Sequence, residues 1–313
     1  MTDGHYDLAI LASSWDQRCL CPLYGGVLHA EKYALILPEH RDDEGRRDAH
    51  DARLRQYIRN ESLGKSCVEI AGATLDVEAM WQRLWDSVTE FVRSQQKPLR
   101  VFVDLSACAR YLSLGLVAGM LRHGWARQVS VFYAEGDYPA QSKFFTTGKW
   151  TTVAVPFLSG RYFPALKRTY IVAAGWEGAK TLRVLANDDP DRVSMILPDP
   201  GVRPEYTQRA YDKNAEVMQV YCVHDEYVRK VHAGDAIGAW KATDELVEKE
   251  TECNVFCLCS GTKPHSLGMA LSAMALGTPA VLYNRPGGHA VVDTTPLGVY
   301  WRYDILDLSL PAA

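Results

Sequence analysis

The chain contains the same series of short sequence motifs twice, once in each half. The motifs come in the same order, and the two members of each pair lie about 150 to 160 residues apart. Four pairs carry the pattern: Trp15-Asp16 with Trp176-Glu177, 36–39 with 196–199, 113–115 with 266–268, and 131–133 with 281–283. A unit of this length is a domain, because the units of a solenoid span only about 20 to 50 residues. We therefore expect two domains built on one plan.

The length of the chain agrees with that organisation. A chain of 313 residues has room for two domains, since a single domain usually holds about 100 to 200 residues. We expect an N-terminal domain over 1–142, a crossover linker over 143–168 and a C-terminal domain over 169–313. Because both halves repeat one plan, we expect pseudo-twofold symmetry between them.

Each half alternates short apolar runs with helical patterns, which is typical of a parallel sheet covered by helices. In the first half the pattern predicts strands at 8–13, 33–37, 66–70, 100–105 and 128–133, and helices at 76–93 and 111–122. In the second half it predicts strands at 169–174, 192–197, 216–221, 254–259 and 280–283, a last strand at 298–303, and helices at 178–187, 204–213, 235–249 and 264–276. The charged run 41–51 fits a solvated loop or the start of a helix. The fold class is therefore α/β, with two tandem Rossmann-like, doubly wound parallel-sheet domains.

Composition and charge exclude several classes of protein. Hydrophobic residues make up 47% of the chain and charged residues 23%, as in ordinary globular proteins. The net charge of −4 argues against direct nucleic-acid binding, because such domains usually carry a basic excess. No apolar run is long enough for a membrane helix, and the N-terminal residues lack the pattern of a signal peptide. We expect a cytoplasmic protein without a membrane partner.

The eight cysteines do not form a metal-binding pattern. Cys19 and Cys21 are separated by one residue, as are Cys257 and Cys259, whereas paired zinc ligands usually have two to four residues between them. Small buried core residues explain these cysteines better than a metal or redox role does. We expect neither a metal nor a cofactor.

The expected binding crevice lies at one edge of each sheet. In a doubly wound sheet with strand order 3-2-1-4-5, ligands bind between the loops that follow strands 1 and 4. In both halves these loops are rich in small and polar residues. The expected ligand-binding residues are Ser13, Trp15, Asp16, Ser106 and Arg110 in the first half, and Trp176, Glu177, Ser260, Gly261, Thr262, Lys263 and His265 in the second.

The second of these loops has the chemistry of an anion site. Gly261 permits a tight turn, Pro264 suits the first position of a helix, and helix N-termini attract anions. Ser260 and Thr262 add hydroxyl groups, and Lys263 adds a positive charge suited to phosphate. The loop lacks the Gly-x-x-x-x-Gly-Lys-Ser/Thr pattern of a Walker A motif. The alternative is that these residues merely cap a helix.

Three further residues have two interpretations each. Arg110 is either the first-half counterpart of the Lys263 cation or a surface arginine at the start of a helix. Trp15 and Trp176 are either stacking surfaces for a base or core residues that pack on the sheet.

The segment 259–271, Cys-Ser-Gly-Thr-Lys-Pro-His-Ser-Leu-Gly-Met-Ala-Leu, resembles the Gly-Thr-Lys loop and following helix of CARF domains. CARF domains are Rossmann-like sensors that bind cyclic oligonucleotides across a dimer dyad. The related SAVED domains fuse two CARF-like units in one chain, which is similar to the duplication seen here. The first half departs from the pattern, with Ser-Ala-Cys-Ala-Arg at 106–110. The resemblance implies a nucleotide sensor whose output comes from a partner effector protein, in prokaryotic antiviral defence.

Two alternatives of other classes stay open. The first is an enzyme that cleaves a nucleotide in the same crevice, with Glu177, Asp199 or His265 as acid or base. The second is a non-catalytic scaffold subunit of a larger defence complex. The absence of a recognised catalytic motif, such as His-x-x-x-His or Gly-x-Ser-x-Gly, favours the non-enzymatic readings.

Overall fold

The computed structural model describes residues 4–24, 28–39, 45–61, 66–73, 76–138, 146–147, 149–250, 252–289 and 294–306. These residues divide into two compact units. The first unit takes its residues from Met1–Thr147 and Gly288–Leu308, and the second from Gly148–Gly287.

The first unit contains a six-stranded sheet in the order β14-β5-β4-β1-β2-β3. Strands β1 to β5 are parallel, and β14 pairs with β5 in the antiparallel sense. A short pair of strands, β6 with β13, accompanies the sheet. The elements are β1 (Gly4–Ala12), the 3-10 turn η1 (Gln17–Leu20), α1 (Cys21–Tyr24), β2 (Leu28–Glu39), α2 (Arg46–Glu61), β3 (Ser66–Ala73), α3 (Val77–Ser94), β4 (Leu99–Asp104), α4 (Arg110–Arg122), β5 (Ala126–Asp137), β6 (Thr146–Thr147), β13 (Gly288–His289) and β14 (Thr295–Leu306).

The second unit contains a sheet of the same kind, in the order β10-β9-β8-β11-β12-β7. Its five parallel strands are β8 to β12, and β7 pairs with β12 in the antiparallel sense. The elements are β7 (Thr151–Ala154), β8 (Lys167–Ala173), α5 (Gly178–Asp188), β9 (Arg192–Pro198), α6 (Pro204–Val220), η2 (Asp225–Tyr227), β10 (Val228–Val231), α7 (Ala236–Glu248), β11 (Cys253–Cys259), α8 (Lys263–Leu276) and β12 (Ala280–Arg285).

In both units the five parallel strands follow the order 3-2-1-4-5, so the predicted fold class is confirmed. The sixth strand of each sheet, however, comes from a part of the chain that the sequence pattern assigns elsewhere. The last strand, expected at 298–303 within the C-terminal domain, pairs with β5 of the first sheet. Strand β7 lies in the expected linker 143–168 and pairs with β12 of the second sheet. Each half of the sequence pattern therefore lacks the strand that completes its sheet.

One predicted strand is wrong. Residues 216–221 continue the helix α6 instead of forming the third strand of the second half. Val217 extends the buried stripe of Ala210 and Asn214, while Val220 is 56% exposed, which is helical spacing rather than alternation. The third parallel strand is β10, a few residues further on. Of the charged run 41–51, the part from Arg46 forms the start of α2, and 41–44 lie outside the described residues.

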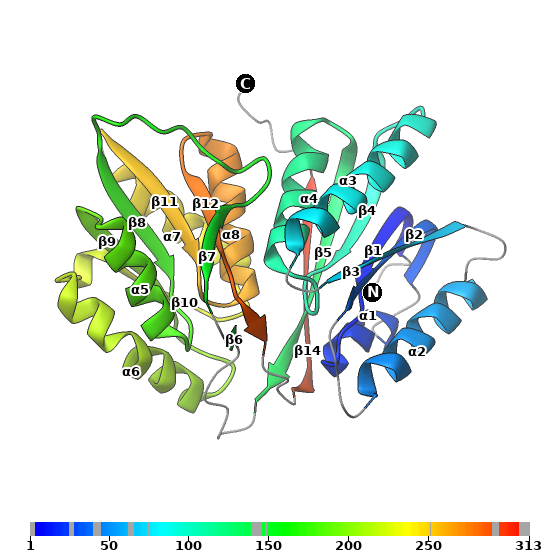
Figure 1. Ribbon diagram of the computed structural model, residues 1–313, viewed down its shortest axis with the longest axis horizontal. Helices are drawn as coiled ribbons and strands as arrows, with labels where there is room; N and C mark the ends of the chain where they lie inside the picture. Colours follow the sequence, from blue (N-terminus) through cyan, green and yellow to red (C-terminus); the bar gives the residue numbers. More distant parts are fainter. Residues whose placement is uncertain are drawn as a thin grey trace. The chain divides into compact units, whose positions relative to one another are not determined.

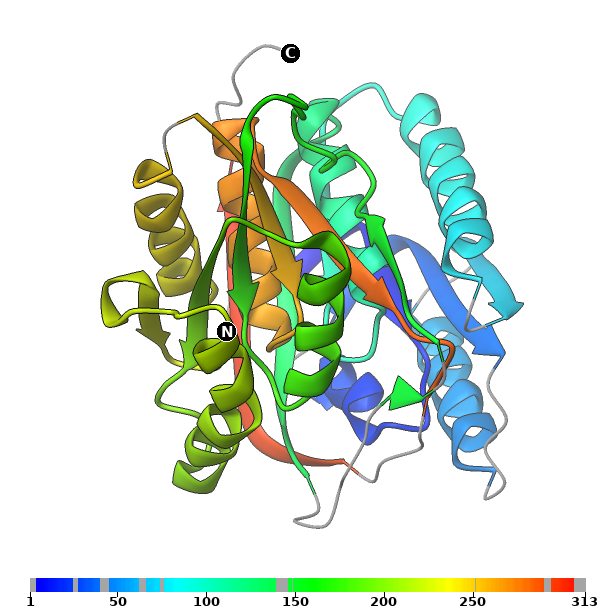
Figure 2. The same ribbon diagram turned by 60° about the vertical axis from the view of Figure 1, so that its left-hand side comes forward.

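Helices cover both faces of each sheet (Figure 1). In the second unit, α5 and α6 pack with the sheet residues Val172, Met195 and Leu258 in one core, and α7 and α8 lie together on the other face (Figure 2). In the first unit, α2 and η1 share a core with β1 and β2, whereas α3 and α4 contact each other. The parallel strands point the same way, so the loops after strands 1 and 4 meet at one edge of each sheet.

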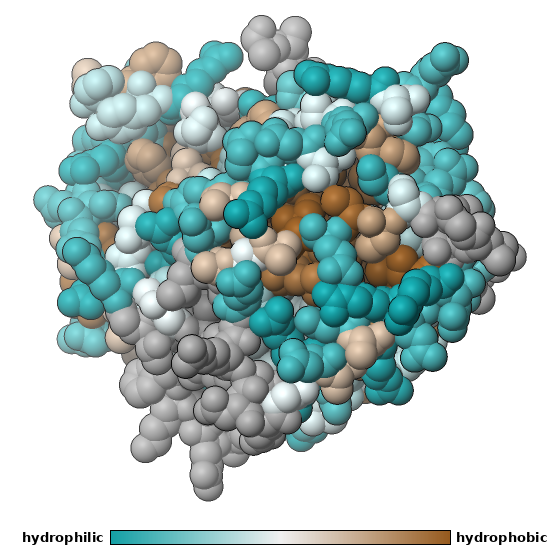
Figure 3. All heavy atoms as spheres, turned by 45° about the vertical axis from the view of Figure 1, so that its right-hand side comes forward, coloured by the Kyte–Doolittle hydropathy of each residue, from teal (hydrophilic) through white to brown (hydrophobic). Residues whose placement is uncertain are grey.

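Hydrophilic side chains cover most of the face drawn in Figure 3, and hydrophobic ones show in a recessed area at its middle. None of the helices within the described ranges is long and apolar enough to span a bilayer.

Candidate functional site

The loops after β8 and β11 touch backbone to backbone at the carboxyl edge of the second sheet. A Cβ atom added to Gly175 would lie 2.3 Å from the carbonyl oxygen of Ser260. A Cβ added to Gly261 would lie 2.7 Å from the carbonyl oxygen of Ala174. Two glycines therefore allow the close approach, at the point where the strand order reverses.

The loop after β11 then turns directly into α8. The Thr262 side chain caps the helix, because its Oγ1 accepts a hydrogen bond of 3.3 Å from the backbone N–H of His265. Lys263 is the first residue of the helix, and Pro264 follows it. The positive end of the helix therefore lies beside this loop, and a lysine stands at the first position of the helix.

The hydroxyl group of Ser260 is buried and has no hydrogen-bond partner among the described residues. Ser260 is the first residue after β11, immediately before Gly261. A buried hydroxyl without a partner is rare in folded proteins, because it loses its bonds to water and gains none in return.

More polar atoms of the same kind come from the face of the sheet that α5 covers. Both side-chain atoms of Asn284, the indole N–H of Trp150 and the hydroxyl of Thr181 are buried and without a partner within the described ranges. Thr181 is fully buried on the sheet-facing side of α5. These three residues and Ser260 are named the strand-end cluster below.

The register of the strands places Asn284 on the face of the sheet that α5 and α6 cover. Leu258 pairs with Leu282, and both belong to the core beneath α5 and α6. Asn284 follows Leu282 by two residues within β12, so it lies on the same face and nearer the carboxyl edge, and Ser260 is the first residue after β11. Asn284 in turn lies opposite Thr152, and Trp150 precedes Thr152 by two residues.

A buried lysine adds a positive charge to the strand-end cluster. Lys180, in the first turn of α5, is only 7% exposed. Its Nζ lies 3.5 Å from the Glu177 carboxylate and 5.8 Å from the centre of the Trp150 ring. The guanidinium of Arg183 lies over the same ring at 5.9 Å. Two cations of α5 therefore lie beside the indole ring of Trp150.

Trp176 does not join this arrangement in the way that the base-stacking interpretation expects. Its indole N–H donates to the carbonyl oxygen of Tyr206 at 3.2 Å, and the two rings meet edge to face. The guanidinium of Arg209 lies 4.3 Å from the ring centre of Trp176. Contacts with α6 therefore account for the position of this tryptophan.

His265 is fully buried beneath the loop. Its Nε2–H donates to the carbonyl oxygen of His232 at 3.0 Å, and it thereby ties α8 to the loop after β10. Burial lowers the pKa of His265 to about 4, so the imidazole is neutral at pH 7. The other two residues of the enzyme alternative also have partners within the fold. Glu177 pairs with Lys180, and Asp199 accepts a hydrogen bond from the Tyr211 hydroxyl. These contacts therefore do not join Glu177, Asp199 and His265 in one group.

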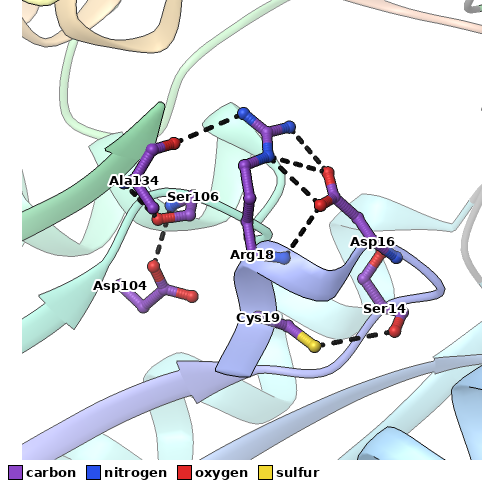
Figure 4. A network of polar contacts seen from close by, with 7 residues as sticks. All are labelled: Ser14, Asp16, Arg18, Cys19, Asp104, Ser106 and Ala134. Carbon is purple, nitrogen blue, oxygen red and sulfur yellow. Dashed lines mark hydrogen bonds and ion pairs between the residues drawn. The ribbon is translucent and has the colours of Figure 1, made fainter. Parts of the chain in front are cut away.

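The first unit fills the same edge of its sheet with an internal ion pair (Figure 4). The Asp16 carboxylate accepts from the backbone N–H of Arg18 at 2.9 Å and lies 2.6 Å from its guanidinium. The guanidinium also reaches the carbonyl oxygen of Ala134 at 3.5 Å. Burial disfavours the charge on Arg18, but the Asp16 carboxylate together with Tyr138 and Tyr133 outweighs this effect and holds the pKa of Arg18 above its usual value.

Ser106 is also engaged within the fold. Its Oγ accepts from the backbone N–H of Ala134 at 2.9 Å, and its own N–H donates to Asp104 at 2.8 Å (Figure 4). Ser13 is likewise fully buried, and its hydroxyl donates to Asp51. These two predicted ligand contacts therefore have partners inside the protein.

The structure brings the predicted residues together in two groups, one in each unit. Trp15 and Arg110 are partly exposed at the edge of the first sheet, in the loop after β1 and at the start of α4. Sequence reasoning missed Trp150, Lys180, Thr181 and Asn284 in the second unit, and Arg18, Asp51 and Asp104 in the first. The polar residue that follows an apolar strand, as Asn284 follows 280–283, is the one signal that could have found any of them.

The chain matches no protein-family model and none of the curated proteins. Among solved structures it is similar to a type III CRISPR defence DNA nuclease activated by cyclic oligoadenylate, with 10% identity, a TM-score of 0.48, and coverage of 91% of this chain and 67% of that chain. It is also similar to an ABC transporter solute-binding protein from Burkholderia multivorans, with 11% identity, a TM-score of 0.25, and coverage of 79% and 77%. Both TM-scores lie below 0.5, so the function proposed below depends on the geometry of this chain's own residues.

Proposed function

We propose that the second unit binds a nucleotide-like small molecule at the carboxyl edge of its sheet. The observation that carries the proposal is the strand-end cluster, in which buried polar atoms from one strand, one helix and two loops have no partner among the described residues. A bound ligand that pairs with these atoms would recover the free energy that their burial costs.

The chemistry of the neighbouring residues favours a nucleotide over other small molecules. Lys180, Lys263 and the N-terminus of α8 supply positive charge for phosphate. The indole of Trp150 and the amide of Asn284 supply a planar surface and a hydrogen-bonding group for a base. The location agrees with the rule that open α/β sheets bind ligands where the strand order reverses.

The proposal extends from binding to signalling. The chain would sense the nucleotide, with cyclic oligonucleotides among the ligands, and pass its state to a protein effector in antiviral defence. The resemblance of 259–271 to the Gly-Thr-Lys loop of CARF sensors supports this part. Mass spectrometry of small molecules released from the purified protein, and of proteins that copurify with it, would identify the ligand and the effector.

Calorimetry with a panel of mononucleotides, dinucleotides and cyclic oligonucleotides tests the binding step. We expect the Ser260→Ala variant to bind its best ligand about five- to tenfold more weakly, because it loses a hydrogen bond worth about 1 kcal/mol. Ser194→Ala is the matched control. Ser194 is a fully buried serine in β9 whose hydroxyl also has no partner among the described residues, and it lies on the opposite face from the core residues Val193 and Met195.

Nucleotide binding that Ser260→Ala weakens and Ser194→Ala leaves unchanged would support the proposal. The absence of binding across the whole panel would overturn it. Equal binding by both variants would place the ligand elsewhere on the chain.

A further inference from the structure

Asn284 differs from the other buried asparagines that the structure describes, because its amide forms no hydrogen bond with another described residue. It is 2% exposed, and neither its Nδ2 nor its Oδ1 has a hydrogen-bond partner in the part of the chain that the structure describes. Asn254 in the same sheet is also 2% exposed, but its amide accepts from the N–H of Phe163 and donates to the carbonyl oxygens of Phe163 and Leu166. Asn254 therefore has a structural role, whereas the contacts of Asn284 give it none.

The place of Asn284 brings its amide to the proposed ligand. It lies near the carboxyl end of β12, on the face that carries Leu282 and, one strand away, Leu258, and Ser260 begins the loop after that neighbouring strand. On the other side it lies opposite Thr152 of β7, the strand that Trp150 precedes. The ring of Trp150, whose buried indole N–H also has no partner among the described residues, lies beside Lys180 and Arg183 of α5, the helix that covers this face.

We infer that Asn284 reads the hydrogen-bonding edge of the base of the bound nucleotide, with Trp150 as a second donor. This inference rests on the function proposed above. A primary amide presents one acceptor beside donors, which matches a base edge that offers an amino group next to a ring nitrogen, as adenine and cytosine do. A site built to bond such a group rejects an analogue that lacks it, because the buried amide would then stay unpaired.

The inference predicts a coupling between one group of the ligand and one side chain of the protein. In calorimetry, the wild-type protein should bind a nucleotide with a 6-amino purine at least tenfold more tightly than the same nucleotide with hydrogen at that position. The Asn284→Leu variant should bind both with similar affinity. Trp150→Phe keeps the aromatic ring and loses only the N–H, so it gives an independent second variant that should reduce the discrimination in part.

Thermal unfolding of the free protein provides a readout that does not depend on ligand. Replacement of an unpaired buried amide by an apolar side chain of similar size should leave the midpoint unchanged or raise it, so Asn284→Leu should fold. The matched variant Asn254→Leu should lower the midpoint, because three backbone groups lose the hydrogen bonds that Asn254 now makes with them.

The outcomes separate this inference from the proposed function. If the wild-type protein binds nucleotides but shows the same affinity with and without the amino group, or if Asn284→Leu keeps the discrimination, Asn284 does not read the base while nucleotide binding stands. An Asn284→Leu variant as destabilised as Asn254→Leu would assign Asn284 a structural role and overturn the inference as well. The absence of any nucleotide binding to the wild-type protein would overturn the proposed function and this inference together.

Discussion

Ser106 in the first unit and Ser260 in the second both follow the fourth parallel strand of a sheet with the same strand order. The Ser106 hydroxyl accepts a hydrogen bond from the backbone of Ala134, whereas the buried hydroxyl of Ser260 has no partner among the described residues. The first unit also closes this edge with the buried pair of Asp16 and Arg18. The two serines at equivalent places thus differ, because the hydroxyl of Ser106 is paired within the fold and that of Ser260 has no hydrogen-bond partner among the described residues.

The difference shows that the strand order alone does not determine which polar groups at this edge are paired. In the second unit, Gly175 and Gly261 let two loops meet without side chains between them. In the first unit, the corresponding loops carry Asp16, Arg18 and Ser106, whose side chains fill the space and pair with one another or with the backbone. The side chains at the edge therefore determine whether its polar groups are paired within the protein.

The largest effect is expected where the first unit closes its edge. Asp16→Ala leaves the Arg18 guanidinium buried without its carboxylate, and such a loss costs about 3 to 5 kcal/mol of unfolding free energy. Arg55→Ala, which breaks an exposed pair with Glu69, should cost less than about 1 kcal/mol. Chemical denaturation of both variants measures the contrast. Equal costs for the two variants would mean that the Asp16–Arg18 pair does not close the edge of the first unit.

The second prediction concerns pH and the buried His265 of the second unit. Its folded pKa of about 4 lies below the ordinary value of 6.5, so the unfolded chain binds the proton first as the pH falls. The stabilisation that the neutral imidazole contributes is therefore complete above pH 6.5. It is lost as the pH falls from 6.5 to 4, and the total loss of unfolding free energy is on the order of 3 kcal/mol. Unfolding free energies at several pH values measure this loss.

The variant His265→Gln keeps a donor for the carbonyl oxygen of His232 and cannot be protonated in this range. It should flatten the decline between pH 6.5 and 4 relative to the wild-type protein. His224→Gln changes an exposed histidine and should leave the pH profile unaltered. A decline that persists in full in His265→Gln would show that other groups cause it.

The smallest expected difference in stability is between the variants Ser106→Ala and Ser260→Ala. Ser106→Ala should cost about 1 to 2 kcal/mol, because it leaves the N–H of Ala134 buried without an acceptor. Ser260→Ala should change the stability of the free protein by less than about 0.5 kcal/mol, since it removes a hydroxyl without a partner in the described residues. Thermal and chemical denaturation in the absence of nucleotide distinguish the two. A loss of 1 kcal/mol or more in Ser260→Ala would remove the asymmetry between the units.

The order of the parallel strands could be predicted from the sequence, whereas one parallel strand and the antiparallel edge strand of each sheet could not. Alternating apolar runs and helical patterns were enough for the 3-2-1-4-5 order, because local patterns and short connections determine it. The pattern at 216–221 misled, because a short, mostly apolar run such as 217–221 fits a buried strand as well as a helix. Strands β7 and β14 could not be assigned to their sheets, because their pairing depends on contacts between distant parts of the chain.

The loop residues of the proposed site could be named from the sequence, whereas its buried residues could not. The loop 260–263 follows a strand and begins a helix, so its residues could be named from order along the chain. Trp150 and Asn284 join it only through the antiparallel register of β7 with β12, and β7 lies in a segment without a clear pattern. Whether a serine is paired also depends on a neighbouring strand, as the contact of Ser106 with Ala134 shows.

Hydrogen exchange of the wild-type protein with and without a bound nucleotide tests the central asymmetry most directly. The account predicts that the nucleotide slows exchange of backbone amides in the second unit, around 260–265, 178–181 and 282–285, and leaves 13–18 and 104–107 of the first unit unchanged. Protection of the first-unit loops, or equal protection of both sets, would contradict it.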